Sequence, residues 1–590
     1  MTTLSLHQAW TTLRSSPWHI QYATIAALLL LPFLLTYVLT SLRASFGRRI
    51  AARPGPGPKE APVAPYAVPL LAHTFQFAVR TEKFLWHMLS LFPATPFRLF
   101  VGPQKFTFIP HGDLVLALFR SSRDLTAKPL TITSLRDLFA MRPADLTVFL
   151  RDDSGIHAKP LPGFESFPPA HRVFFAQHRD LHNLLTGTAL DVMTSRFITL
   201  YSSHLHSTPS LPRTTDWTPL PDLYAFLRTS MFTAATTALC GPHLLRLAPT
   251  LPADFWAYDR DLMLFLRRTP RLLAPRAHAT RDRVLAAFAA WHAHAAAHFP
   301  ASDLASPLPE WEPLWGARLN RARALMFSGA GLSAHGRASQ DLGMLWATNA
   351  NVVPSTMWAL LEIYRTPGLE GRVRAEVDGC WDEGRGEFDV PALCGRPLLT
   401  SIYHEALRYS VGVTPARDIL VEEVEVGGWR FRRGETLMCN TWFGGRDEGF
   451  WNVGRVVGGR AEHPVDEFWA ERFLEYPDDP ASGPVRKKDE SVYRGAGGKA
   501  KTVEDDRTAK VVTAGTAGHF FPYGGGTKIC PGRFFAKQEM VAAIAVLMRE
   551  FEVELLDVEG SRKTRPDMKY FPAGSLPPDR AVPVRMRRRR

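Results

Sequence analysis

A glycine-rich loop that leads directly into an apolar helical segment is the feature that most restricts how this chain can fold. The loop reads FFPYGGGTKICPGRFFAKQE over residues 520–539 and carries one cysteine, Cys530. Free N–H groups at a helix N-terminus favour negative charge, glycines allow a close backbone approach, and Pro531 suits a first helical turn. A buried structural cysteine is the alternative. The complete pattern favours a thiolate that binds a metal.

Two charged residues on one face of a predicted apolar helix form a second constraint. Glu405 and Arg408 lie three positions apart in SIYHEALRYS, so their side chains share a helix face. In an apolar helix this spacing predicts a buried ion pair, whereas on a solvated helix it carries no structural meaning. Another arginine, Arg472, follows in Ala470-Glu-Arg-Phe473.

The loop resembles the cysteine signature of the cytochrome P-450 superfamily, Phe-x-x-Gly-x-Arg-x-Cys-x-Gly. Tyr523 stands at the Phe position, Gly526, Cys530 and Gly532 match, and Lys528 takes the Arg position. The resemblance implies haem b (iron protoporphyrin IX) as the cofactor, with Cys530 as the axial ligand of the iron. It also makes Tyr523, Gly526 and Lys528 candidate cofactor-binding residues. Lys528 would pair with a haem propionate, but it lacks the planar fork of arginine.

The same resemblance extends to the charged residues upstream. Glu405, Arg408 and Arg472 would form the triad that stabilises the fold around the haem without taking part in the chemistry. Arg417, which opens a strand-rich stretch, corresponds to an arginine that contacts a haem propionate in many relatives.

Residues 343–365 predict one long helix, ended by Thr366-Pro-Gly368. It resembles the helix that crosses the haem, where the family usually has an acid–alcohol pair that relays protons. Ala350 occupies the acid position and Asn351 the alcohol position, which makes them the candidate catalytic residues. With Pro354 they resemble the branch of cholesterol 7α-hydroxylase, sterol 12α-hydroxylase and prostacyclin synthase. Pro354 removes one helix hydrogen bond and should loosen the preceding turn.

Residues from about 70 to 300 alternate apolar helical runs with proline-rich turns. Phe175 and Arg179 are candidates for the family's Trp-x-x-x-Arg pair that contacts the haem, although this spacing also arises by chance on an amphipathic helix. In the family, such a region forms the roof of the substrate pocket, and plain core packing explains each residue equally well. The apolar and aromatic runs are 200–205, 223–245 and 255–266.

The N-terminal region predicts a membrane anchor. No Asp, Glu, Lys or Arg occurs from Ser15 to Leu42, which is long enough to span a bilayer; a cleaved signal peptide is the competing interpretation. We expect a short lumenal segment (1–18), a transmembrane helix (19–42) and a basic, proline-rich linker (43–69). The arginines after the apolar run predict a cytosolic catalytic domain. The resemblance to microsomal members implies a single-pass protein of the endoplasmic reticulum membrane.

The expected fold class is mainly α with a small β-rich subdomain, the cytochrome P-450 fold, over residues 70–577. The polar segment 478–519 predicts a disordered insertion, and the Arg-rich end, 578–590, a basic tail. The net charge is +13, but no nucleic-acid motif accompanies it, so we expect no nucleic-acid partner. Five cysteines without paired spacing argue against a disulfide framework and for a reducing compartment.

The resemblance implies a membrane-anchored monooxygenase that activates O2 with electrons from NADPH. Its partners would be a separate NADPH–cytochrome P-450 reductase, cytochrome b5 as a candidate second donor, membrane lipid and a lipophilic small-molecule substrate, such as a sterol, a terpenoid or another secondary metabolite. Two alternatives remain. One is a reductase-independent isomerase of the prostacyclin synthase kind, and the other is a haem-binding membrane protein without catalysis.

Overall fold

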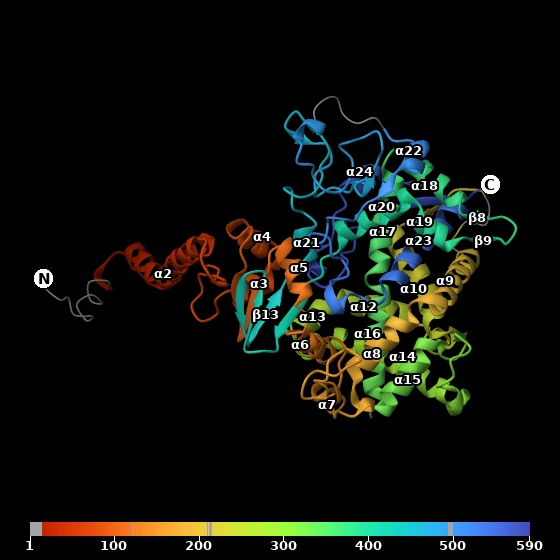
Figure 1. Cartoon of the computed structure of the whole chain (residues 1–590), viewed down its shortest axis with the longest axis horizontal. Coiled ribbons are helices and arrows are strands. Elements are labelled where there is room, and N and C mark those ends of the chain that lie inside the picture. Colours follow the sequence, from red (N-terminus) through yellow and green to blue (C-terminus); the bar gives the residue numbers. More distant parts are fainter. Residues whose placement is uncertain (1–13, 122, 209–210, 212–214, 494–499, 590) are drawn as a thin grey trace. The chain divides into compact units, whose positions relative to one another are not determined.

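The computed structural model describes residues 14–121, 123–208, 211, 215–493 and 500–589 (Figure 1). The chain forms two compact units. The first comprises the chain up to Thr126 together with Pro415–Cys439, and the second comprises Ala127–Thr414 together with Asn440–Arg590. We call them the β-rich unit and the helical unit.

The β-rich unit contains two sheets. One has the strand order β2-β3-β13-β10-β4 and the other the order β1-β12-β11. Buried Glu435 holds the larger sheet together, because it accepts hydrogen bonds from Arg98 (3.1 Å), Lys105 (2.9 Å) and Thr107 (3.0 Å). The elements of this unit are α2 (Trp18–Ala52), β1 (Lys59–Glu60), α3 (Thr74–Val79), α4 (Thr81–Leu91), β2 (Phe97–Val101), β3 (Gln104–Phe108), α5 (Asp113–Arg120), β4 (Leu125–Thr126), β10 (Ala416–Ile419), β11 (Glu423–Val426), β12 (Trp429–Arg432) and β13 (Glu435–Met438).

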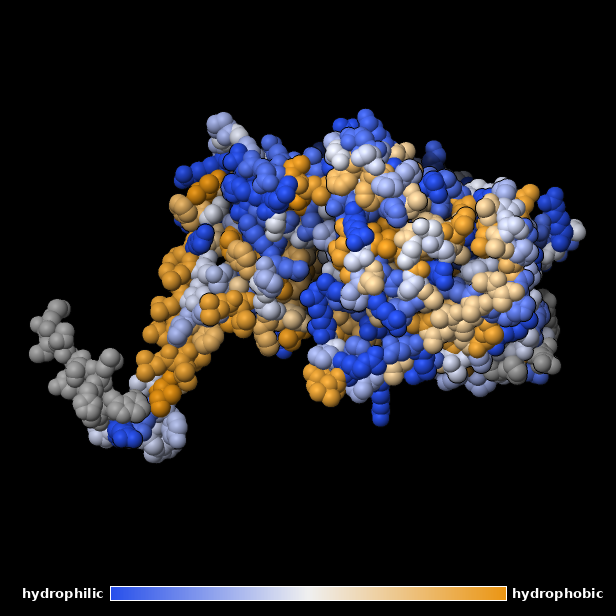
Figure 2. All heavy atoms as spheres, turned by 90° about the horizontal axis from the view of Figure 1, so that it is seen from below, coloured by the Kyte–Doolittle hydropathy of each residue, from blue (hydrophilic) through white to orange (hydrophobic). Residues whose placement is uncertain are grey.

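Helix α2 is long and apolar enough to cross a membrane. Its most apolar window has a mean hydropathy of 2.2 and is wholly unburied, and Figure 2 shows hydrophobic side chains along it. The helix has 35 residues and ends at Ala52, so it continues through the first part of the segment expected to be a linker. At about 1.5 Å per residue it exceeds a hydrocarbon core of about 30 Å. Residues 1–13 of the expected lumenal segment lie outside the described residues.

The helical unit surrounds α17, which is packed against α10, α20 and α23 (Figure 1). Every residue of α17 from Val352 to Ile363 is buried. The long helices of the helical unit are α8 (Val173–Leu184), α9 (Gly187–Ser207), α10 (Leu223–Cys240), α12 (Leu251–Arg260), α14 (Pro275–His298), α15 (Arg318–Gly329), α16 (Ala334–Asn349), α17 (Val352–Arg365), α18 (Leu369–Asp378), α20 (Pro397–Ser410) and α23 (Arg533–Glu550).

Shorter elements connect these helices: α6 (Lys128–Thr133), η1 (Ser134–Leu138), α7 (Pro143–Arg151), η2 (Pro169–His171), β5 (Thr218–Leu220), α11 (Pro242–Leu247), α13 (Leu262–Leu266), η3 (Ala301–Asp303), β6 (Trp311–Glu312), β7 (Gly316–Ala317), β8 (Trp381–Asp382), β9 (Glu387–Phe388), α19 (Val390–Gly395), α21 (Thr441–Gly444), β14 (Val456–Val457), β15 (Arg460–Ala461), β16 (Leu474–Glu475), η4 (Glu490–Tyr493), α22 (Val503–Thr508), β17 (Lys510–Val511), η5 (Gly526–Lys528), β18 (Phe551–Leu555), α24 (Val558–Lys563), η6 (Met568–Tyr570) and β19 (Val584–Arg588). The predominance of helices beside small sheets agrees with the expected fold class.

The predicted long helix over 343–365 is two helices. α16 begins earlier, at Ala334, and ends at Asn349, and α17 begins at Val352. The break falls at Ala350 and Asn351, one turn before Pro354, whose missing N–H cannot continue the α16 hydrogen-bond ladder.

The expected disorder over 478–519 is corrected for the parts that the structure describes. Thr502 caps α22 in a capping box with Asp505, and buried Asp506 pairs with Arg372 of α18 at 2.7 Å. β17 pairs with β16. A charged helix thus gains order from partners distant in sequence. Residues 494–499 of this segment lie outside the described residues.

The expected basic tail is also corrected. β19 pairs with both β18 and β5, and its Val584 and Met586 are fully buried. Arg585 and Arg587 alternate with these two residues, are less buried, and pair with Glu554 and Glu552 of β18. The alternation of buried and charged residues makes this segment a strand. Arg590 lies outside the described residues.

Candidate active site

The cysteine loop folds back before it enters α23. The N–H of Cys530 donates to the carbonyl of Tyr523 at 3.0 Å, and Gly524 and Gly526 adopt φ of 69° and 66°, which favours glycine. A Cβ at Gly532 would lie 3.8 Å from the Cys530 Sγ. The loop therefore brings backbone close to the sulfur.

The thiol of Cys530 lies at the N-terminus of α23, which begins at Arg533. Burial raises its pKa, while the backbone N–H groups of Gly532 and Arg533 and the charge of Arg533 oppose this. Two amide donors aimed at one sulfur are suited to a thiolate, and coordination by a metal deprotonates such a thiol.

The phenol of Tyr523 connects the loop to α20. Its hydroxyl lies 2.7 Å from the hydroxyl of Tyr403, and burial raises the pKa of both phenols. Both therefore stay protonated, and their hydrogen bond helps to position the loop against α20.

Lys528 lies beside α8. Its Nζ is 5.9 Å from the centroid of the Phe174 ring. Burial lowers the pKa of His178, and the charge of Lys528 lowers it further. Leu185, just after α8, would lie 4.0 Å from a Cβ at Gly532. The face of α8 toward the cysteine loop thus carries Phe174 and His178.

The predicted pair Phe175 and Arg179 is displaced by one position from that face. Arg179 pairs with Asp180 at 2.8 Å and its side chain is 51% exposed. Phe175 stacks under Arg172 at 4.5 Å. Sequence reasoning missed Phe174 and His178, which have the same four-residue spacing; only the contact with the loop distinguishes the two pairs.

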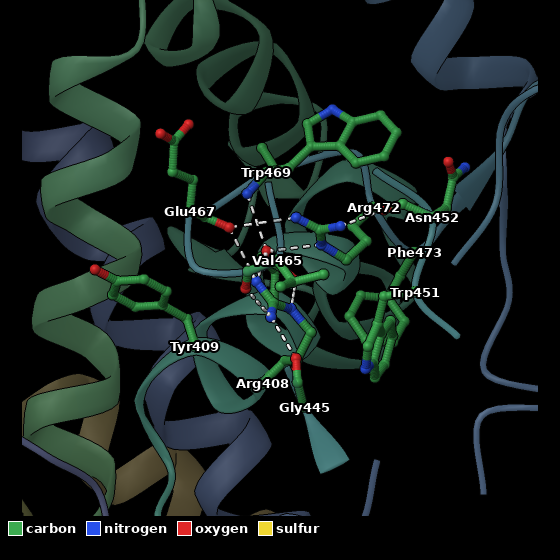
Figure 3. A network of polar contacts seen from close by, with 12 residues as sticks. Arg408, Tyr409, Gly445, Trp451, Asn452, Val465, Glu467, Trp469, Arg472 and Phe473 are labelled. Atoms are coloured by element: carbon green, nitrogen blue, oxygen red, sulfur yellow. Dashed lines mark hydrogen bonds and ion pairs between the residues drawn. The ribbon is translucent and has the colours of Figure 1, made fainter. Parts of the chain in front are cut away.

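Arg408 and Arg472 belong to one network of polar contacts (Figure 3). Glu405 pairs with both arginines, and all three side chains are fully buried. Glu405 binds Arg408 at 2.7 Å and Arg472 at 3.0 Å, and it accepts the N–H of Trp469 at 2.9 Å. Burial raises the pKa of Glu405, but the two guanidinium charges and these hydrogen bonds outweigh it and hold the pKa below its usual value. The carboxylate therefore stays ionised.

The arginines of this network use their remaining donors on backbone carbonyls. Arg408 donates to Gly445, Val465 and Glu467. Arg472 donates to Asn452, Pro464 and Glu467. Through these bonds one ion cluster fixes α20 and the loops that follow α21.

Asn351, at the break between α16 and α17, is held by the segment before the C-terminal strand. Its Oδ1 accepts the backbone N–H of Ser575 at 3.0 Å, and a Cβ at Gly574 would lie only 2.5 Å from that oxygen. Because Oδ1 is engaged as an acceptor, Nδ2 is left as the donor of this amide. Neighbouring Ala350 lines a small cavity with Ser575.

Arg417 belongs to the β-rich unit, on β10. It is buried, with 9% of its surface exposed, and its Nη1 donates to the carbonyl of Ala416 at 2.9 Å. Burial lowers its pKa. The other predicted residues form three groups in the helical unit: Tyr523, Gly526, Lys528 and Cys530 on the loop, Ala350 and Asn351 at the helix break, and the triad.

Comparison with known proteins now identifies the family. A family model described as cytochrome P-450 matches residues 328–454 and 507–580. The cytochrome P-450 monooxygenase fsoE of Humicola fuscoatra is 33% identical over 571 residues, which cover 94% of this chain and 92% of that protein. The chain belongs to the cytochrome P-450 family. The P-450 monooxygenase efuG of Hormonema carpetanum is 30% identical over 98% of both chains.

A more distant P-450 relative is the cholesterol 7-alpha-monooxygenase of Cricetulus griseus, 27% identical over 255 residues, or 41% of this chain and 43% of that protein. These matches confirm the expected family and the expectation that the chain is a P-450 monooxygenase. Haem is the cofactor that this family implies. The cysteine loop fits it, because it combines one sulfur, two amide donors on that sulfur and a lysine on the same loop.

Proposed function

We propose that this P-450 is a membrane-anchored haem-thiolate monooxygenase that oxidises a lipophilic substrate with O2 and electrons from NADPH. The observation that carries the proposal is the Cys530 sulfur at the start of α23, with the amides of Gly532 and Arg533 directed at it. The catalytic domain would extend over residues 70–577 and also include β19, which pairs with β18 and β5, and the cofactor would be haem b. When bound, the haem supplies the activation of O2.

The residues of the chain bind and orient the reactants. Cys530 would ligate the iron as a thiolate, and Lys528 and Arg417 would each pair with a propionate. Tyr523 and Gly526 would shape the loop that holds the haem. Ala350 and Asn351 would face the substrate side. A neutral amide does not exchange protons as a carboxyl does, so Nδ2 of Asn351 would orient a hydrogen-bonded group rather than relay protons.

The partners follow from the membrane helix and the cofactor chemistry. An NADPH–cytochrome P-450 reductase would deliver electrons, with cytochrome b5 as a second donor. Helix α2 would anchor the protein in the endoplasmic reticulum membrane with the catalytic domain in the cytosol, since Arg43, Arg48 and Arg49 follow the apolar stretch. The substrate would be a sterol, a terpenoid or another lipophilic secondary metabolite.

Spectroscopy of the reduced, CO-bound protein tests the thiolate. We expect the strongly red-shifted Soret band of thiolate-ligated haem in the wild type and its loss in Cys530→Ser. Cys394→Ser is the matched control, because Cys394 is also a half-buried free cysteine, and it should keep the band. A wild-type band at the position typical of imidazole ligation would contradict the proposal.

Asn351 in place of an acid–alcohol pair keeps a second candidate function, the reductase-independent rearrangement of a peroxide. Reconstitution with and without reductase and NADPH separates the two. The monooxygenase proposal predicts product only when both are present. Turnover of a lipid peroxide that is undiminished without them would favour the isomerase.

A further inference from the structure

We infer that Asp259 of α12 binds a hydroxyl group on an otherwise apolar and uncharged substrate. This inference rests on the proposed function, because it places the substrate on the Ala350 side of the helix break. It goes further, since it specifies a chemical feature that the substrate carries before oxidation and the residue that recognises it.

The geometry is that of a small cavity of about 10 Å³ beside the break between α16 and α17. Asp259 lines it from α12, Trp346 lines it from the last turn of α16, and Ala350 lines it from the break itself. The remaining wall is apolar or weakly polar and consists of Leu262, Met263, Tyr570, Ala573 and Ser575. Asp259 is the single carboxyl group of this lining, and it lies in the same cavity as Ala350.

The Asp259 carboxyl is only half satisfied. Its Oδ1 accepts a hydrogen bond from Trp346 Nε1 at 3.0 Å, and the residue is 7% exposed. Oδ2 has no hydrogen-bond partner among the residues that the structure describes, so it is the oxygen left to face the cavity. Buried polar groups are usually hydrogen-bonded, and an unmatched one favours a ligand that supplies the missing partner.

The surrounding charge favours a neutral donor. Arg228 of α10 stacks on Tyr224 at 5.0 Å and on Trp256 at 5.9 Å, and its positive charge acts on Asp259. Burial raises the pKa of Asp259 to about 7, against the Trp346 hydrogen bond and the Arg228 charge. The charge of Arg228 already acts on this carboxyl, so a cationic ligand would bring a second positive charge into a buried site. A hydroxyl brings no charge, and it pairs with either state of the carboxyl, because it donates to the carboxylate and accepts from the protonated form.

This position has a consequence for selectivity. A hydroxyl held by Oδ2 fixes the orientation of an apolar skeleton relative to Ala350 and Asn351. The site of oxidation would then be set by its distance from a hydroxyl that the substrate already carries. The reaction that supplies this substrate must therefore leave or install a hydroxyl group.

The test uses the full-length holoprotein in detergent and two series of 1-alkylimidazoles of increasing chain length, with and without a terminal hydroxyl. Imidazole binds haem iron and shifts its spectrum whatever stands at the chain end. We expect one chain length at which the hydroxyl tightens wild-type binding about tenfold, equivalent to about 1.4 kcal/mol. The matching ammonium probe should gain nothing over the plain alkyl chain.

Two variants locate the effect. Asp259→Asn keeps an acceptor for Trp346 and should lose most of the hydroxyl preference, and Asp259→Leu should lose all of it while the alkyl probes still bind. Asp261→Asn is the control, because Asp261 pairs with Arg260 near the surface, and it should bind like the wild type. A hydroxyl preference that is absent at every chain length, or that persists in Asp259→Leu, would overturn the inference and leave the haem-thiolate assignment intact. Absence of haem spectra would overturn the proposed function itself.

Discussion

The side-chain oxygen of Asn351 accepts the backbone N–H of Ser575 at 3.0 Å. The hydroxyl of Ser575 in turn lies 2.8 Å from that of Ser355 and 3.0 Å from that of Ser410. Ser575 thus links the segment between η6 and β19 to the start of α17 and to the end of α20. The amide of Asn351 is therefore held by more than its own helix, and its Nδ2 has a defined direction.

Substitution of Asn351 should separate its anchoring role from its donor role. Asn351→Asp keeps an acceptor for Ser575 and removes the Nδ2 donor, whereas Asn351→Ala removes both. We expect Asn351→Asp to melt near the wild-type temperature and Asn351→Ala to lose about 1–3 kcal/mol of unfolding free energy, because the Ser575 N–H is left unpaired. Both should form less product per NADPH consumed. Equal stability of the two variants would contradict the anchoring role.

The Glu405 network should be essential for folding. Glu405→Gln leaves the guanidinium groups of Arg408 and Arg472 buried without their counter-charge, at a cost of about 3–5 kcal/mol. We expect little haem-loaded protein and a strongly lowered melting temperature. Glu504→Gln is the control, because Glu504 and Arg507 have the same spacing but are largely exposed; it should change stability by less than about 1 kcal/mol. Comparable losses in both variants would refute the role of burial.

The segment 478–519 should be docked through Asp506. Its carboxylate binds Arg372 and also accepts the hydroxyl of Tyr476 at 3.0 Å. Asp506→Asn weakens the ion pair, so α22 should exchange its amide hydrogens faster and be cut sooner by trypsin at Lys501 and Arg507. Asp505→Asn, which alters the exposed capping box, is the comparison. Protection equal to the wild type in Asp506→Asn would show that the ion pair does not hold α22.

Glu539 of α23 should make stability depend on pH. It is fully buried, and neither carboxyl oxygen has a hydrogen-bond partner among the described residues, so burial raises its pKa well above the usual 4.5. The folded state then holds a proton that the unfolded state releases above about pH 4.5, so unfolding free energy falls as pH rises.

The comparison for Glu539 is Glu539→Gln, which has no proton to lose. We expect the unfolding free energy of the variant to rise relative to that of the wild type as pH rises above 4.5, by at most about 1.4 kcal/mol per pH unit. Melting temperatures across this range measure the gap. A gap that stays constant or shrinks with rising pH would mean that Glu539 finds a partner in solution.

Local motifs could be predicted from the sequence, and distant partnerships could not. The cysteine loop and the spacing of Glu405 and Arg408 are contained within short stretches. By contrast, Asn351 meets Ser575 across 224 residues, and Asp506 meets Arg372 across 134 residues. No local pattern encodes such pairs. Charge also misled the sequence reasoning, since α22 and β19 look solvated until their ion-pair partners are known.

The same limit explains the displaced pair on α8. Phe175 with Arg179 and Phe174 with His178 have identical spacing, and the choice between them depends on which helix face meets Lys528. Likewise, hydrophobic periodicity predicts helix over 343–365 but does not show that the helical hydrogen bonds are interrupted between Asn349 and Val352.

The pairing of β19 bears on how the protein can be shortened or tagged. β19 is the middle strand of the sheet β18-β19-β5, so trimming the Arg-rich end after Val582 would unpair two neighbours at once. The residues left as open edges would be Phe551–Leu555 and Thr218–Leu220, and open edges invite aggregation between molecules. The Arg-rich end therefore has a structural role, because it joins β5, in the first half of the chain, to β18, near its end.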